Sequence, residues 1–198
     1  MSNYKESVNT EWNNSWDNCQ TAKDTLENAV LEHEETVFEY EDSPSLYNEM
    51  TNGMNKIWGF LCSRHEESEM LNGIHEKLDF EYGSDEMFGI SIILVDNKYQ
   101  VFLNVSGNNI NLADETALND LFGSGGEELT KSVMAFGKSV VEYIESSNKR
   151  YESLNPQLID VSLLLENINV GSRNDIISGD HKYNQNILSE IYDPIIVK

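Results

Sequence analysis

The stretch that decides the fold class is residues 87–105, MFGISIILVDNKYQVFLNV. Its first half is rich in β-branched residues, and its second half alternates apolar and polar side chains with a period of two. Asp96 and Asn97 separate the two halves and are typical of the tight turn of a hairpin. The stretch therefore predicts two antiparallel strands, and residues 110–112 could add a third short strand after a second turn.

The chain before this hairpin predicts helices. Residues 9–40 contain neither proline nor glycine, and their apolar or large side chains recur at helical spacing along one seam: Trp12, Trp16, Cys19, Leu26, Val30, His33, Val37 and Tyr40. This spacing is typical of a long helix that packs one face against a neighbour. A proline ends it, and residues 46–61 show a second helical series, so we expect a helical hairpin. Gly53 and Gly59 weaken the second helix by about 1 kcal/mol each, and one more short helix is expected to end near Gly83.

The chain after the strands predicts a short helix over residues 114–121 and a long helix over residues 127–150. The long helix has an apolar stripe that would pack on the sheet, formed by Leu129, Val133, Phe136, Val140 and Ile144. Apolar runs beyond residue 156 fit either strand or helix. The predicted fold class is α+β: an N-terminal helical hairpin or bundle, then a small antiparallel β-sheet packed with a long helix. We divide the chain into an acidic helical region, 1–85, and an α+β region, 86–198, which could also form one continuous domain.

The charge of the chain limits its partners. Among 198 residues, 35 are acidic and 13 are basic, for a net charge of -22, and most of the excess lies before the strands. Such a charge repels nucleic acid and anionic membranes, so we expect neither as a direct partner and expect a basic protein instead. No segment resembles a signal peptide or a membrane span, and Cys19 and Cys62 share no metal or redox spacing. We therefore expect a cytoplasmic protein, or one in the host cytoplasm if the chain is viral.

Carboxylates crowd the end of the first predicted helix and are the candidate partner-binding residues. Six of the twelve residues between 31 and 42 are Asp or Glu. On a helix, carboxylates three or four residues apart have Cβ atoms about 5–6 Å apart, which is near the separation of successive phosphates along a nucleic-acid strand. The full set is Glu27, Glu32, Glu34, Glu35, Glu39, Glu41 and Asp42. We interpret it as a phosphate-like surface, the alternative being a solvated helix face that only provides solubility.

Other residues give no motif for catalysis, metal or cofactor binding. Cys62 and His65 lack the paired spacing of a zinc site, and the glycines at 123–126 are followed by two glutamates where a phosphate loop would have lysine. We therefore expect no cofactor, no metal and no enzymatic activity. The tryptophans, Trp12, Trp16 and Trp58, are expected in the core, with a partner-binding patch as the alternative.

Two functional hypotheses follow. The first is a non-enzymatic acidic inhibitor, of the kind that phages encode, which mimics nucleic-acid charge and blocks a basic nucleic-acid-binding protein. The second is an immunity or antitoxin-like protein that plugs the basic active site of a toxin. The sequence also allows a homodimer, because the apolar seam over residues 12–40 could pack within one chain or between two chains.

Overall fold

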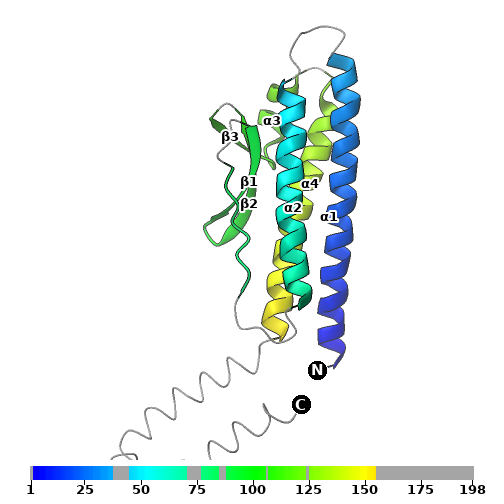
Figure 1. Ribbon diagram of the computed structural model, residues 1–198, viewed down its shortest axis with the longest axis vertical. Helices are drawn as coiled ribbons and strands as arrows, with labels where there is room; N and C mark the ends of the chain where they lie inside the picture. Colours follow the sequence, from blue (N-terminus) through cyan, green and yellow to red (C-terminus); the bar gives the residue numbers. More distant parts are fainter. Residues whose placement is uncertain are drawn as a thin grey trace, which may run out of the picture. The chain divides into compact units, whose positions relative to one another are not determined.

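The structure, a computed structural model, describes residues 2–37, 45–70, 77–84, 88–105, 107–123 and 125–154. These residues belong to the first of two compact units, Met1–Leu154, and the second unit is Asn155–Lys198. Figure 1 shows the elements in chain order: α1 (Ser2–Val37), α2 (Ser45–Met70), β1 (Phe88–Val95), β2 (Lys98–Val105), β3 (Asn108–Asn111), α3 (Glu115–Phe122) and α4 (Glu127–Leu154). The predicted α+β class is confirmed. The apolar runs expected beyond residue 156 lie outside the described residues.

The sheet has the order β1-β2-β3, and both pairs are antiparallel. Asp96 and Asn97 connect β1 to β2 with φ angles of 50° and 62°, the left-handed conformation that suits a two-residue hairpin turn. The predicted hairpin and third strand are confirmed, and β3 begins two residues earlier than expected.

The predicted short helix ending near Gly83 is wrong for the described residues 77–84. Tyr82 instead forms a bridge with Ile92 of β1, through two backbone hydrogen bonds of 3.0 and 2.8 Å. Phe80 is buried in the core beside this bridge. The backbone N–H and C=O groups of Tyr82 therefore form their hydrogen bonds with the edge of β1 and not within a helix. The spacing of residues in the sequence could not reveal this long-range pairing.

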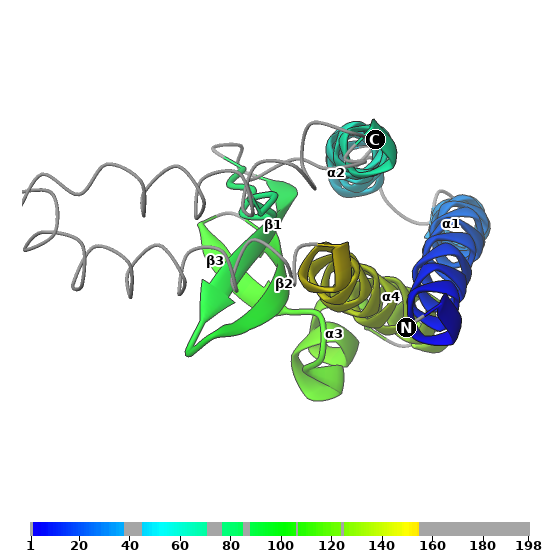
Figure 2. The same cartoon turned by 90° about the horizontal axis from the view of Figure 1, so that it is seen from below.

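The predicted N-terminal helical hairpin or bundle is present, and α4 joins α1 and α2 in it. α1 packs chiefly along α4, which runs in the opposite direction, and α2 packs against β1. Figure 2 shows α2 and α4 between the sheet and α1. The apolar seam of α1 thus finds its main partner more than a hundred residues further along the chain.

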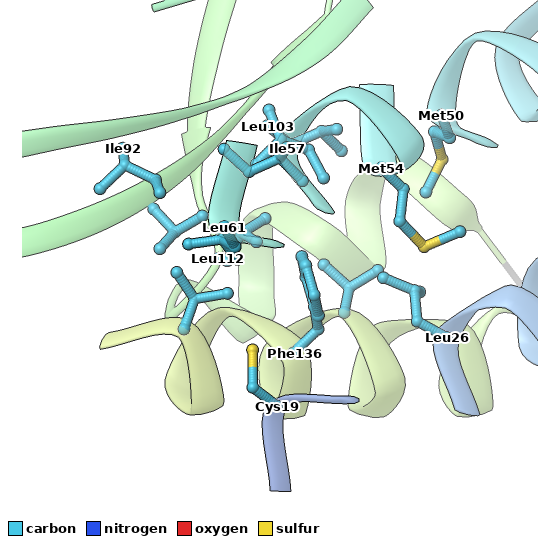
Figure 3. Packing of buried hydrophobic residues seen from close by; sticks show 14 of the residues in the cluster. Cys19, Leu26, Met50, Met54, Ile57, Leu61, Ile92, Leu103, Leu112 and Phe136 are labelled. Atoms are coloured by element: carbon cyan, nitrogen blue, oxygen red, sulfur yellow. The ribbon is translucent and has the colours of Figure 1, made fainter. Parts of the chain in front are cut away.

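One core joins all of these elements. Figure 3 shows Cys19 and Leu26 of α1, Ile57 of α2, Leu103 of β2 and Phe136 of α4 packed together. The predicted stripe of α4 is buried throughout. Gly53 has a packing role, because a Cβ there would lie 3.0 Å from the Cα of Gly89. The absence of a side chain lets α2 approach the backbone of β1 closely.

Candidate functional site

The predicted acidic set is only partly described. Glu27 forms an ion pair of 2.8 Å with Lys23, which neutralises this carboxylate. Glu32 is exposed on α1. Glu34 and Glu35 lie in the last part of α1. The remaining predicted residues, Glu39, Glu41 and Asp42, lie outside the described residues.

The rest of α1 carries a longer acidic face. The helix has eight carboxylates and two lysines over its 36 residues, a length of about 54 Å. Glu6, Asp17 and Asp24 are exposed and share the side of α1 that faces away from the core. This density is about one carboxylate per 7 Å, roughly half the charge density of one DNA strand. Carboxylates are therefore distributed along the whole length of α1, and not only at its C-terminal end.

A groove with a volume of about 1020 Å³ runs between α1 and α4. Four carboxylates and one lysine line it: Glu6, Glu11, Glu142, Glu145 and Lys149. Its floor contains Ser15 and Ser146, whose hydroxyl oxygens are 2.5 Å apart and hold the two helices together. Lys149 binds Glu11 and Lys138 lies 3.7 Å from the Glu142 carboxylate, so two of the four carboxylates are paired with lysines, and Glu6 and Glu145 remain along the groove.

Sequence reasoning missed this groove. Glu142 and Glu145 are three residues apart and exposed on α4, which is an ordinary pattern for a solvated helix face. Only the packing of α4 against α1 places them beside Glu6 and Glu11. The sequence showed that α1 is acidic. It did not show that α4 packs beside α1.

A column of aromatic rings fills the junction of α1 and α2. The imidazole of His65 lies between the indoles of Trp12 and Trp16, with ring centroids 4.5 and 4.0 Å away and planes within 16° of parallel. Trp58 stacks on Trp16, with a centroid distance of 5.0 Å and an angle of 13°. The order along the column is Trp12, His65, Trp16, Trp58. Trp12 is buried, whereas Trp16 and Trp58 are half-buried against the core.

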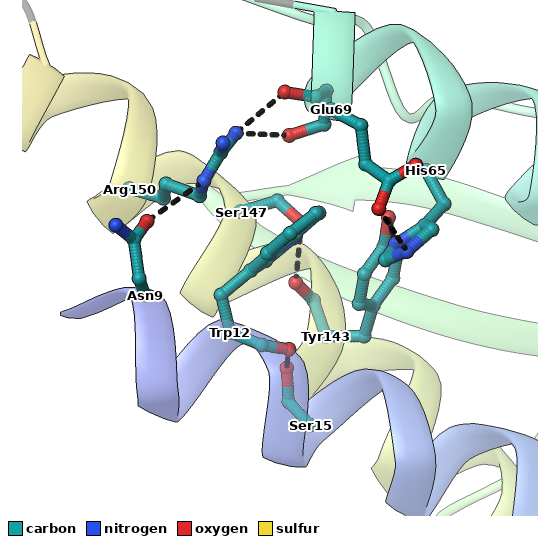
Figure 4. A network of polar contacts seen from close by, with 9 residues as sticks. Asn9, Trp12, Ser15, His65, Glu69, Tyr143, Ser147 and Arg150 are labelled. Atoms are coloured by element: carbon teal, nitrogen blue, oxygen red, sulfur yellow. Dashed lines mark hydrogen bonds and ion pairs between the residues drawn. The ribbon is translucent and has the colours of Figure 1, made fainter. Parts of the chain in front are cut away.

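Arg150 closes one end of this column, as Figure 4 shows. Its guanidinium carbon lies 4.3 Å from the centre of the Trp12 ring. It donates hydrogen bonds to the Ser68 carbonyl and hydroxyl oxygens and, at 3.0 Å, to the Asn9 side-chain oxygen. Arg150 of α4 thus connects α1 and α2, and the stacking of a guanidinium on an aromatic ring adds to this attachment.

The column keeps His65 neutral at neutral pH. Burial lowers the pKa of His65 below its ordinary value of 6.5, whereas the Glu69 carboxylate opposes this shift and the Arg150 charge adds to it. The Nδ1 atom lies 3.3 Å from the Tyr143 hydroxyl, and Nε2 lies 3.9 Å from the Glu69 carboxylate. Burial also raises the pKa of Tyr143, which therefore stays protonated as a hydrogen-bond partner.

The sequence offered Cys19, Cys62 and His65 as the residues to consider for metal or redox chemistry. Cys19 and Cys62 are free thiols, and burial raises the pKa of Cys19 to about 11. Within the described ranges, no group of three or more His, Cys, Asp or Glu side chains could hold a metal ion. His65 is enclosed in the aromatic column between Trp12 and Trp16.

Comparison with protein-family models, with curated proteins and with solved structures finds no match for this chain. None of the helices in the described part of the chain is long and apolar enough to cross a membrane. The functional interpretation therefore rests on the acidic face of α1, the groove beside it and the aromatic column.

Proposed function

We propose that this chain is a non-enzymatic acidic protein that binds a basic protein partner and thereby competes with nucleic acid for it. The observation that carries the proposal is the groove between α1 and α4, which is lined by four carboxylates and a single lysine. The exposed carboxylates of α1 extend this charge along the helix. A protein that binds phosphates presents lysine and arginine at its surface, and such a surface is complementary to this face.

The size of the individual interactions decides what kind of binding to expect. An exposed ion pair contributes only about 0–1 kcal/mol, so no single carboxylate would hold a partner. Many such pairs acting together would give fast association and a strong dependence on ionic strength. The net charge of -22 leads us to expect the same dependence on ionic strength for the whole molecule.

The second candidate is an immunity-like protein that neutralises a toxin. The observation that favours it is the fixed shape of the groove, because the Ser15–Ser146 contact holds its two helices together. A toxin inhibitor would use shape and bind one partner, whereas a nucleic-acid mimic would bind several nucleic-acid-binding proteins. The range of partners captured by the chain therefore separates the two candidates.

The proposal is tested with the full chain as bait in a lysate of the source cells, at low and high salt, with mass-spectrometric identification. The groove variant carries Glu6→Gln, Glu142→Gln and Glu145→Gln. A matched control removes the same charge from exposed residues outside the groove, by Glu115→Gln, Asp120→Asn and Glu127→Gln. We expect wild type and control to capture the same basic proteins at low salt, and the groove variant to lose them. Equal capture by both variants would contradict the groove as the binding site.

A further inference from the structure

A hollow with a volume of about 500 Å³ lies between α4 and the sheet, whereas the acidic groove lies between α4 and α1 (Figure 2). We propose that the basic partner inserts an aromatic side chain into this hollow while its cationic side chains lie along the groove. This inference rests on the proposed function, because it assumes that the partner is basic. It adds the residue type that the partner must present beside its charges.

The walls of the hollow are largely apolar. Val101 and Leu112 line it and are buried, and Met134 and Val141 of α4 line it and are half-buried. One wall is fixed in place, because α4 approaches Leu112 so closely that a Cβ at Gly137 would lie 2.7 Å from the Leu112 Cβ. The volume is that of on the order of fifteen waters at roughly 30 Å³ each, which is room for a whole aromatic ring. Such a ring would displace water from apolar walls and could contact the Met134 thioether.

The polar groups around the hollow are paired with one another. The side chain of Asn111 donates a hydrogen bond of 2.7 Å to the Gln100 side-chain oxygen and accepts one of 2.9 Å from the Ala113 backbone N–H. Lys138 and Glu142, both exposed, lie 3.7 Å apart, so their charges balance. The hollow therefore offers apolar surface without an excess of charge, and this favours an uncharged, apolar occupant.

The exposed ridge of α4 connects the hollow with the groove. Its residues recur every three or four positions: Ala135, Lys138, Glu142, Glu145 and Lys149. The first two line the hollow, the last two line the groove, and Glu142 lines both. Ala135 and Glu145 are about 15 Å apart along the helix. One partner surface lying along α4 would therefore meet both sites.

An apolar anchor supplies what the groove alone lacks. Exposed ion pairs are individually weak, whereas most of the binding energy of an interface comes from a few buried side chains, aromatic ones prominent among them. A hollow with apolar walls beside an acidic groove thus matches a partner that presents an aromatic side chain next to its lysines and arginines.

The test uses two lysine nonapeptides, one with a central phenylalanine and one with a central alanine. Each is titrated by fluorescence anisotropy into the full chain at low salt, and a nonapeptide can span up to about 30 Å, enough to reach both sites. We expect wild type to bind the phenylalanine peptide about ten-fold more tightly, as expected for burial of one ring. In NMR spectra, the methyl signals of Met134 and Val141 should shift with this peptide and not with the alanine peptide.

Two variants locate the effect. Ala135→Leu puts a larger side chain in the wall of the hollow and should lose most of the preference for phenylalanine, with unchanged salt dependence. Asn28→Leu is the matched control, because it adds the same side chain at an exposed position of α1 that lines neither site, and it should keep the preference. Circular dichroism checks that Ala135→Leu folds. Should it not fold, Val141→Thr puts a hydroxyl in the same wall and should reduce the preference; an unreduced preference would overturn the inference.

The outcomes separate this inference from the proposed function. If neither peptide binds wild type at low salt, the proposed function fails and the inference fails with it. Equal binding of both peptides, a full preference in Ala135→Leu or unshifted methyl signals would overturn only the role of the hollow. The acetylated amide of phenylalanine, which carries no lysine, distinguishes a small-molecule site. If it shifts the methyl signals at as low a concentration as the peptide does, the hollow is a small-molecule site and the inference is overturned.

Discussion

His65 is the residue whose charge the aromatic column controls most directly. Its two faces are covered by indoles, and its nitrogens face the Tyr143 hydroxyl and the Glu69 carboxylate. Protonation would place a second cation near Arg150 in a desolvated position. The column is therefore built for a neutral imidazole, which predicts a pH dependence of folding stability.

The free energy of unfolding should fall as the pH drops below about 6.5, the ordinary pKa of histidine. Below that pH the unfolded chain binds a proton at His65 before the folded chain does, so the unfolded state gains stability. His65→Phe keeps an aromatic ring in the stack and removes this proton. Denaturant unfolding above and below pH 6.5 should show a smaller pH-dependent loss for the variant. His33, whose pKa burial also lowers, is present in both proteins, and an equal loss in both would contradict the account.

At the scale of elements, α2 contains two glycines that the sequence alone treats alike. A Cβ at Gly53 would lie 3.0 Å from the Cα of Gly89, whereas a Cβ at Gly59 would have no neighbour within 4 Å. Gly53 is therefore required by the contact between α2 and β1. Gly59 contributes only flexibility to the helix.

The two glycines predict opposite effects of the same substitution. Gly59→Ala should stabilise the protein by up to about 1 kcal/mol, the difference in helix propensity. Gly53→Ala should destabilise it by about 1–2 kcal/mol, because overpacking against the backbone of β1 exceeds that gain. Thermal or denaturant unfolding of the two variants measures the difference. Stabilisation by both substitutions would show that α2 does not lie closely against β1.

The elements themselves could largely be predicted from the sequence, because each has a clear local pattern. A run of β-branched residues predicted β1, alternation predicted β2, and helical spacing predicted α1 and α4. The partner of α1 could not be predicted, because a periodic seam shows which face is buried and not what covers it. The segment around Tyr82 was misjudged for the same reason, since its backbone pairs with a strand ten residues away.

The candidate site was predictable only in part. The sequence located negative charge on α1, but the groove also needs Glu142 and Glu145 from α4. Burial of Trp12 followed from helical spacing, yet the stack with His65 depends on how α1 and α2 are placed against each other. Lys23, which neutralises Glu27, was four residues away and could have been recognised from the spacing alone.

At the scale of the whole molecule, charge and packing act in opposite directions. A net charge of -22 opposes compaction through repulsion, and a continuous apolar core together with the Arg150 contacts holds the helices against it. The groove brings carboxylates from two helices to one face of the protein. The central claim is therefore that this face takes the place of nucleic acid on a basic partner.

The most direct test is displacement of fluorescent duplex DNA from a nucleic-acid-binding protein captured by the chain. Wild type should displace the DNA, and the groove variant with Glu6→Gln, Glu142→Gln and Glu145→Gln should need about ten-fold more protein, as expected for three weak ion pairs. The control with Glu115→Gln, Asp120→Asn and Glu127→Gln should displace DNA like wild type. DNA that stays bound at saturating wild-type protein, or equal displacement by the groove variant, would contradict the account.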